Sequence, residues 1–390
     1  MSRDDSKTVV AIPRIQTCKR TSHVGFVREG MRHRFHALCP YFAMFPETFA
    51  ERWIEKLTKR REVVLDPFSG RGTTATCALL SGRRAIATDV NDVAYGPTKA
   101  QHGGTPLSTV MSRLHELMER FRPARCDAEA AALPEFFQHA FHAETLRQII
   151  HLRKSLDWKR RRADTMIAAI ALGSLHGESS KSPSYFSNQM PRTISTKPAY
   201  SIRFWNARRM IAPKRNAFTI IKERLKYRYE SPRPDGEATI MQRDMRELPW
   251  VAEKLPGPIR CVVTSPPYFD VTNFEEDQWL RLWFLGGPSK PTIGRQSRDD
   301  RYSFEADYWN FIADMWRSLG SILARGGHVV VRLGSTRIAP DQLRDQLVAA
   351  TRFSPQPLKL IHHECSVIQD RQTDAFRPGT TGCKVEVDCV

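Results

Sequence analysis

Short apolar runs and helix-like spacing alternate in two separate stretches of the chain. The first stretch, residues 61–91, reads REVVLDPFSGRGTTATCALLSGRRAIATDVN. The run VVL, a glycine-containing turn, an apolar helix that ends at Gly82 and the run AIAT give the order strand, helix, strand. Because the crossover in such a unit is right-handed and its strands are parallel, the pattern predicts a doubly wound parallel sheet.

The α/β pattern resumes in residues 236–390. Strand-like runs occur in ATIM, CVVT, HVVVRLGS, LKLIHHECSVI and CKVEVDCV, and residues 308–327 have helical spacing. One α/β domain is therefore predicted from two sequence blocks with an insertion between them. The predicted divisions are an N-terminal extension at 1–34, the first half of the domain at 35–100, the insertion at 101–235 and the second half at 236–390.

The insertion differs in character from its flanks. LSTVMSRLHELMERF and AETLRQIIHLRKSL place apolar residues at helical spacing, whereas residues 181–216 are rich in Pro, Ser, aromatic residues and Arg and predict no regular structure. A basic, largely helical insertion is the expectation. Beyond it, residues 273–287 again have helical spacing. Trp279, Arg281 and Trp283 are expected to serve as core and salt-bridge residues, with contacts to the base or substrate as the alternative.

Positive charge is concentrated in the insertion. The chain carries 60 Lys and Arg against 42 Asp and Glu, a net charge of +18, and residues 151–230 alone hold 18 basic and 5 acidic residues. Such an excess favours a polyanionic partner, although a solvated basic surface is the alternative. The basic candidates for phosphate contacts are Arg192, Lys197, Arg203, Arg208, Arg209, Lys214 and Arg215. The aromatic candidates for stacking between them are Tyr185, Phe186, Tyr200, Phe204 and Trp205. The alternative is a basic lid in which some of these aromatic side chains are buried.

Composition also excludes several classes of protein. The 8 cysteines form no C-x-x-C pair, so neither a zinc ribbon nor a disulfide framework is indicated, and no metal is expected. The longest apolar stretch, TMIAAIALGSL, is too short to cross a bilayer, and MSRDDSKTVV lacks the layout of a signal peptide. We expect a cytoplasmic protein.

The turn DPFSGRGTT follows a predicted strand and opens a helix. Gly70 and Gly72 allow the backbone to approach a ligand, and the helix N-terminus offers free N–H groups, but packing alone also explains such glycines. The turn is neither a Walker phosphate loop nor a G-x-G-x-x-G fingerprint. Asp89, after the next strand, is placed to accept hydrogen bonds from ribose hydroxyls. Asp244 ends a third strand and either receives an amino donor or caps a helix.

A second turn, TSPPY, ends the strand run CVV abruptly, because neither proline can donate a ladder hydrogen bond. Ser265 Oγ and the Pro266 carbonyl offer two hydrogen-bond acceptors, and Pro266 and Pro267 stiffen the turn that carries them. An exocyclic base amine is a poor nucleophile, so a site that activates it needs such fixed acceptors. Tyr268 offers a flat face on which a base rotated out of a duplex could stack.

Together, the two turns resemble the amino-methyltransferase family that modifies exocyclic amines of DNA bases with S-adenosylmethionine. DPFSGRGTT resembles its cofactor loop and TSPPY its catalytic motif, while CPYFAMFPETFAERWIEKL at 39–57 is similar to the segment that walls its methionine pocket. The resemblance covers about 35–95 and 240–335 and implies a Rossmann-like, seven-stranded sheet. It assigns cofactor binding to Phe45, Pro46, Asp66, Phe68, Gly70, Gly72, Thr73, Asp89 and Asp244, and catalysis to Ser265, Pro266, Pro267 and Tyr268.

Within this family, Ser at the first position of the catalytic motif resembles enzymes that methylate cytosine N4, and Asp is more typical of adenine N6. The resemblance implies methylation of double-stranded DNA at a specific sequence, with one base flipped and a cognate restriction endonuclease conceivable as a separate chain. A covalent C5 route is disfavoured because the chain has no Pro-Cys pair. The alternatives are an adenine-N6 enzyme, a transfer-RNA guanine-N2 methyltransferase and a non-catalytic nucleic-acid binder.

Overall fold

The centre of the fold is a seven-stranded sheet with the strand order β3-β2-β1-β4-β5-β7-β6. The computed structural model describes residues 33–40, 45–177, 184–187, 197–269, 274–291, 304–367 and 385–390. The strands are β1 (Val63–Asp66), β2 (Arg84–Thr88), β3 (Ala238–Met241), β4 (Ile259–Thr264), β5 (Leu323–Ser335), β6 (His363–Val367) and β7 (Val385–Cys389). All pairings from β3 to β5 are parallel, and β7 runs antiparallel to both of its neighbours. The predicted doubly wound, mostly parallel sheet is confirmed.

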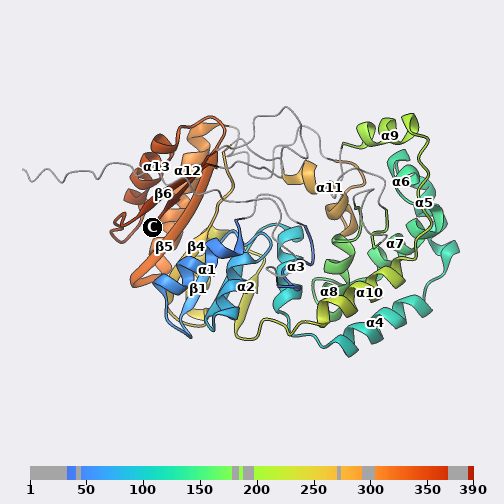
Figure 1. Cartoon of the computed structure of the whole chain (residues 1–390), viewed down its shortest axis with the longest axis horizontal. Coiled ribbons are helices and arrows are strands. Elements are labelled where there is room, and N and C mark those ends of the chain that lie inside the picture. The colour runs from blue at the N-terminus through green and yellow to red at the C-terminus, as the bar shows by residue number, and fades with distance from the viewer. Residues whose placement is uncertain are drawn as a thin grey trace, which may run out of the picture.

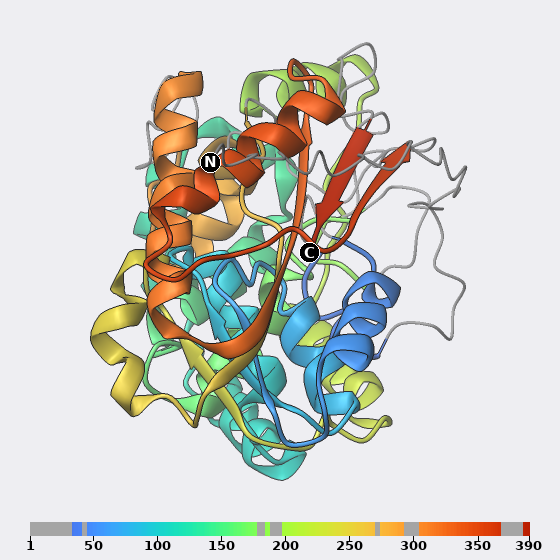
Figure 2. The same cartoon turned by 90° about the vertical axis from the view of Figure 1, so that its left-hand side faces the viewer.

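Helices cover both faces of this sheet. One face packs against α1 (Glu47–Leu57) and α2 (Thr73–Leu80), and the other packs against α12 (Glu305–Ile322), α13 (Pro340–Ala349) and the 3-10 helix η2 (Met245–Lys254). Figure 2 shows α12 and α1 on opposite sides of the strands. Alternate residues of β1 serve the two faces, because Val63 and Leu65 join the α12 core and Val64 joins the α1 core.

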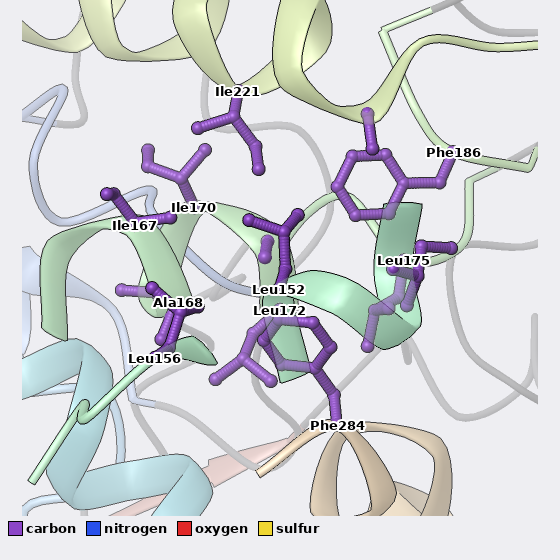
Figure 3. Packing of buried hydrophobic residues seen from close by; sticks show 14 of the residues in the cluster. Leu152, Leu156, Ile167, Ala168, Ile170, Leu172, Leu175, Phe186, Ile221 and Phe284 are labelled. Atoms are coloured by element: carbon purple, nitrogen blue, oxygen red, sulfur yellow. The ribbon is translucent and has the colours of Figure 1, made fainter. Parts of the chain in front are cut away.

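A lobe of helices forms the right-hand side of the molecule in Figure 1. We call α4 to α10 the helical lobe, and α3 (Asp92–His102) packs against it from the sheet side. Its helices are α4 (Leu107–Glu119), α5 (Asp127–Ala132), α6 (Glu135–Ala140), α7 (Ala143–Ser155), α8 (Arg162–Leu172), α9 (Pro198–Ala207) and α10 (Ala217–Tyr229), with the 3-10 turn η1 (Pro123–Cys126) after α4. Figure 3 shows side chains from these helices meeting in a common apolar core.

Helix α11 (Phe274–Phe284) ties the chain that leaves β4 into the helical lobe. Trp279 and Trp283 are buried in the lobe's core, and the Nε of Arg153 on α7 donates to the Trp283 carbonyl at 2.8 Å. Arg281 is also buried and donates to the Pro40 carbonyl at 2.8 Å. The expected core role of Trp279 and Trp283 is confirmed, whereas the recorded bonds of Arg281 go to Gln278 and to backbone carbonyls.

Two element boundaries differ from the sequence prediction. Helical spacing extended to residue 327, but α12 ends at Ile322 and β5 begins at Leu323, which pairs with Ile259 of β4. Ladder pairing with β4 therefore overrides the local helical pattern. Helix α9 lies in a stretch for which no regular structure was predicted, and it begins at Pro198, a residue that suits the first turn of a helix. The 3-10 turn η4 (Ala350–Phe353) follows α13.

Two further findings concern the described part of the chain. None of its helices has the length and apolar character needed to cross a membrane. Within the same residues, His, Cys, Asp and Glu side chains do not gather in groups of three that could hold a metal ion.

The burial of α11 predicts that Trp283→Ala destabilises the protein. Trp283 is 1% exposed, so truncation removes a large apolar side chain and leaves a cavity. We expect the free energy of unfolding to fall by about 3–5 kcal/mol, measured by urea unfolding followed by circular dichroism. Trp250→Ala is the matched control, because Trp250 is 79% exposed and its loss should change stability by less than about 0.5 kcal/mol. Equal effects of the two substitutions would contradict this role of α11.

Candidate active site

The turn after β1 depends on two glycines in the left-handed region. Gly70 has φ +48° and Gly72 has φ +82°, backbone conformations that side chains disfavour. A Cβ on Gly72 would also come within 2.9 Å of Thr98 Cγ2 on α3. The Thr98 hydroxyl donates to the Gly70 carbonyl at 3.2 Å. Both glycines are therefore required by the path of the turn and by its contact with α3.

Asp89 lies against this turn, as the sequence predicted. Its Oδ2 accepts the Gly70 N–H at 2.9 Å, and its Oδ1 accepts the Asn91 N–H at 2.9 Å. Burial raises the pKa of Asp89 to about 6, and these backbone hydrogen bonds oppose the shift. The backbone N–H of Val90 makes a third such bond, and because a carboxylate has about four acceptor positions, about one remains for a hydroxyl group of a ligand.

Asp66 and Thr73 lie beneath the turn rather than on its surface. Asp66 is 1% exposed, and its Oδ1 accepts the Thr264 hydroxyl at 2.7 Å and the Phe68 N–H at 3.1 Å. Burial raises the pKa of Asp66 to about 6, against the effect of these hydrogen bonds. Thr73 is 4% exposed and its hydroxyl bonds to His36 Nε2 at 3.0 Å. These contacts shape the turn from below.

The remaining cofactor candidates lie on several elements. Asp244 follows β3 and caps η2, accepting the Arg246 N–H at 3.0 Å, so the helix-cap alternative is realised. Phe45 is 8% exposed and contacts Phe49 with ring centroids 5.2 Å apart. Pro46 precedes α1, and the ring of Phe68 packs against Phe311 of α12 at 5.4 Å.

A segment that sequence reasoning missed supports the turn from the N-terminal side. The Arg71 Nε donates to the His36 carbonyl at 2.6 Å, and Gln101 of α3 donates to the Arg71 carbonyl at 2.9 Å. The His36 ring bonds to Glu47 of α1 as well as to Thr73. His36 stands outside both motifs, so the sequence contains no signal for this contact.

The turn after β4 is anchored at both ends. Thr264 is held by Asp66, and Phe269 forms an isolated parallel bridge with Ser335 at the end of β5. Between these points, Pro266 is buried, while Ser265, Pro267 and Tyr268 are partly exposed. The acceptors of the turn therefore lie at the carboxyl edge of adjacent parallel strands, where doubly wound folds bind ligands.

Tyr268 makes contacts that the sequence did not predict. Its hydroxyl donates to Glu386 Oε1 on β7 at 2.8 Å, and the Ser265 hydroxyl donates to the Tyr268 oxygen at 3.4 Å. Burial raises the pKa of Glu386, while the Arg332 charge and the Tyr268 hydroxyl act in the opposite direction. The only sequence signal was the placement of acids within the apolar strand VEVDC.

Helix α9, at the upper right of Figure 1, and the residues that flank it carry much of the predicted phosphate-binding surface. Lys197, Arg203, Arg208 and Arg209 are all exposed, whereas Arg192 lies outside the described residues. The Arg208 guanidinium lies 3.8 Å from the centre of the Phe204 ring, and Tyr200 is 51% exposed.

Two of the aromatic candidates for stacking were predicted wrongly. Phe186 and Trp205 are both 0% exposed. Figure 3 shows Phe186 in the core of the helical lobe, and Trp205 packs against Phe136 with ring centroids 5.4 Å apart. These side chains fill the interior of the lobe, because large apolar rings gain more from burial there than from exposure.

Comparison with known proteins gives one family match and one partial relative. Residues 7–96 match the N6_N4_Mtase family model, described as DNA methylase. Over 49 residues the chain is 43% identical to the orphan methyltransferase M.BamHII of Bacillus amyloliquefaciens. That alignment covers 13% of this chain and 18% of M.BamHII, so the chain matches less than a fifth of its relative's length.

Solved structures give a more distant likeness. The rRNA methyltransferase aviRa from Streptomyces viridochromogenes is 14% identical with a TM-score of 0.31, over 90% of this chain and 87% of that one. A putative rRNA-methylase from Clostridium thermocellum is 8% identical with a TM-score of 0.31, over 89% and 98% of the two chains. TM-scores this low support no inference about the substrate.

The buried bond between Thr264 and Asp66 predicts a pH-dependent effect of Thr264→Val. The pKa of Asp66, about 6, exceeds its unfolded value of about 3.9, so the folded protein holds the proton more tightly. The stability contributed by protonated Asp66 is therefore lost as the pH rises from about 4 to 6. Because the Thr264 hydroxyl favours the ionised carboxylate, Thr264→Val should destabilise the protein by about 1–3 kcal/mol at pH 8 and by less at pH 5.

Urea unfolding of wild type and variant at both pH values measures this difference. Thr88→Val is the matched control, since the buried Thr88 hydroxyl donates to the Pro67 carbonyl at 3.1 Å and not to an acid. Its effect should be the same at pH 5 and pH 8. A pH-independent effect of Thr264→Val would show that the bond does not influence ionisation of Asp66.

Proposed function

We propose that this chain, a member of the DNA amino-methyltransferase family, methylates the N4 amine of cytosine in a specific DNA sequence. One observation carries the proposal. The turn with Gly70, which donates to Asp89, and the turn with Ser265 follow the adjacent parallel strands β1 and β4. The bond from Thr264 to Asp66 joins these turns from beneath. A cofactor and a base at these two turns would lie side by side at one edge of the sheet.

S-adenosylmethionine is the methyl donor of this family, and the residues of the first turn fit it. Asp89 keeps an acceptor position for a ribose hydroxyl, and Val90 beside it is 56% exposed, which offers an apolar surface to the adenine ring. Gly70 and Gly72 allow the backbone to approach the ligand. When bound, the cofactor supplies an electrophilic methyl group. Phe45, Pro46, Phe68 and Asp244 would complete the site, with Asp66 and Thr73 supporting it from below.

The second turn would hold the base. The lone pair of an exocyclic amine is delocalised into the ring, so the amine becomes nucleophilic only when acceptors draw its hydrogens out of the ring plane. Ser265 Oγ and the Pro266 carbonyl would accept these hydrogens, and the exposed part of the Tyr268 ring would stack on the flipped base. Ser265, at the first position of the motif, favours cytosine as the substrate base. Adenine is the alternative.

DNA would be bound by the exposed basic surface that α9 forms with the residues at its two ends. Lys197, Arg203, Arg208 and Arg209 supply positive charge for phosphate contacts, and Tyr200 and Phe204 supply aromatic surface beside them. A restriction endonuclease, as a separate chain, would be consistent with a sequence-specific methyltransferase.

Identification of the product tests the proposal directly. Purified protein is incubated with DNA and labelled S-adenosylmethionine, and the hydrolysed nucleosides are identified by mass spectrometry. We expect N4-methylcytosine, because Ser265 begins the catalytic motif. N6-methyladenine would assign the sister specificity, and label found only in RNA would overturn the DNA substrate. RNA incubated in parallel with the same protein serves as the comparison.

Substitutions at the two turns should separate turnover from cofactor binding. Ser265→Ala removes one acceptor for the amine, so kcat should fall about 100-fold while the Kd for S-adenosylmethionine is unchanged. Asp89→Ala should instead raise that Kd at least tenfold, because a charge-assisted hydrogen bond to ribose is lost. Methylation kinetics and calorimetric titration measure the two effects. Loss of cofactor affinity in Ser265→Ala would contradict this division of roles.

A further inference from the structure

We infer that Glu386 positions the hydrogen bonds of the catalytic turn so that Ser265 faces the base as an acceptor. The inference rests on the proposed function of that turn. It starts from the two bonds that join Ser265 to Tyr268 at 3.4 Å and Tyr268 to Glu386 at 2.8 Å. No motif of the sequence pointed to Glu386, which lies on β7, 118 residues after Tyr268.

The surroundings of Glu386 hold its carboxylate in place. Arg332 of β5 lies 3.3 Å from Glu386 and makes two 2.7 Å hydrogen bonds to Asp388. The Phe49 ring covers the guanidinium at 3.9 Å from its centre. On the neighbouring strand, Gly334 pairs with Glu386 and presents no side chain on that face of the sheet. The carboxylate is therefore both fixed and accessible to the turn.

The charge of Glu386 sets the direction of the hydrogen bonds. A carboxylate paired with arginine only accepts hydrogen bonds, so the Tyr268 hydroxyl must donate to it. The Tyr268 oxygen is then an acceptor, and the Ser265 hydroxyl donates its single hydrogen to it. Ser265 Oγ is left with lone pairs alone toward the substrate. An amine, which donates hydrogens, needs this arrangement, whereas a freely rotating serine hydroxyl would present its own hydrogen part of the time.

Three substitutions test this relay. Tyr268→Phe removes only the hydroxyl and keeps the ring, so it avoids the folding risk of a change on β7. Glu386→Ala removes the acceptor, and Glu386→Gln restores an acceptor of the same shape. We expect kcat to fall about tenfold in Tyr268→Phe and Glu386→Ala, roughly the value of one hydrogen bond, with partial recovery in Glu386→Gln. The Kd for S-adenosylmethionine should not change.

Double substitutions separate the relay from a structural role. Because the relay acts through Ser265, adding Tyr268→Phe or Glu386→Ala to Ser265→Ala should lower kcat no further. Glu364→Ala is the matched control, since Glu364 is a carboxylate on the adjacent strand β6 that pairs with Arg52 at 2.8 Å. It should retain kcat within about twofold, as substitutions away from such features do.

A binding measurement without cofactor gives a second readout. DNA with cytosine at the methylated position is compared with DNA that has 2-pyrimidinone there, which is cytosine without its amine. Wild type should bind the cytosine duplex more tightly, and Tyr268→Phe and Glu386→Ala should lose that preference. Wild-type kcat and preference in both variants, or further loss of kcat in the Ser265→Ala background, would overturn the relay alone. Absence of methylation by wild type would overturn the proposed function itself.

Discussion

A buried hydrogen bond joins the two halves of the candidate site. The Thr264 hydroxyl donates to Asp66 at 2.7 Å, across strands β4 and β1, although the two residues are 198 positions apart in the chain. Each stands at the carboxyl end of its strand, immediately before one of the two turns. Because β1 and β4 are adjacent and parallel, this bond fixes the turn that would hold the cofactor against the turn that would hold the base. The helical lobe is inserted between these strands in sequence without separating them in space.

Placing acids at such a junction opposes stability. Burial raises the pKa values of Asp66 and Asp89 to about 6, so ionised carboxylates at neutral pH remain partly uncompensated despite their hydrogen bonds. Burial also raises the pKa of Glu386 near the second turn, where the charge of Arg332 acts in the opposite direction. The stability lost in this way is offset by the apolar cores on both faces of the sheet. In return, the acceptors are oriented before any ligand arrives, which is the condition for catalysis by positioning.

Local patterns in the sequence were sufficient to predict the parallel strands and a position of Asp89 near the glycine-containing turn. Both features belong to one short strand-helix-strand unit. They were insufficient wherever distant segments meet. Asp66 belongs to the cofactor motif, yet its carboxylate turns inward toward Thr264. Glu386 and His36 reach the two turns from outside every motif. The same limit explains Phe186 and Trp205, since alternation of aromatic and basic residues describes composition and does not reveal which side chains are buried.

The packing of the helical lobe connects its basic surface to the second turn. Phe136 contacts Trp205 of α9 at 5.4 Å and Trp279 of α11 at 4.9 Å, measured between ring centres. Helix α11 begins six residues after Tyr268, so one aromatic side chain touches both the helix with the basic surface and the helix that leaves the turn. Because protein interiors are close-packed, these contacts fix the position of α9 relative to α11. Trp205 and Trp279 belong to the same buried core, so the helix beside the basic surface and the helix that follows the second turn are parts of one packed unit.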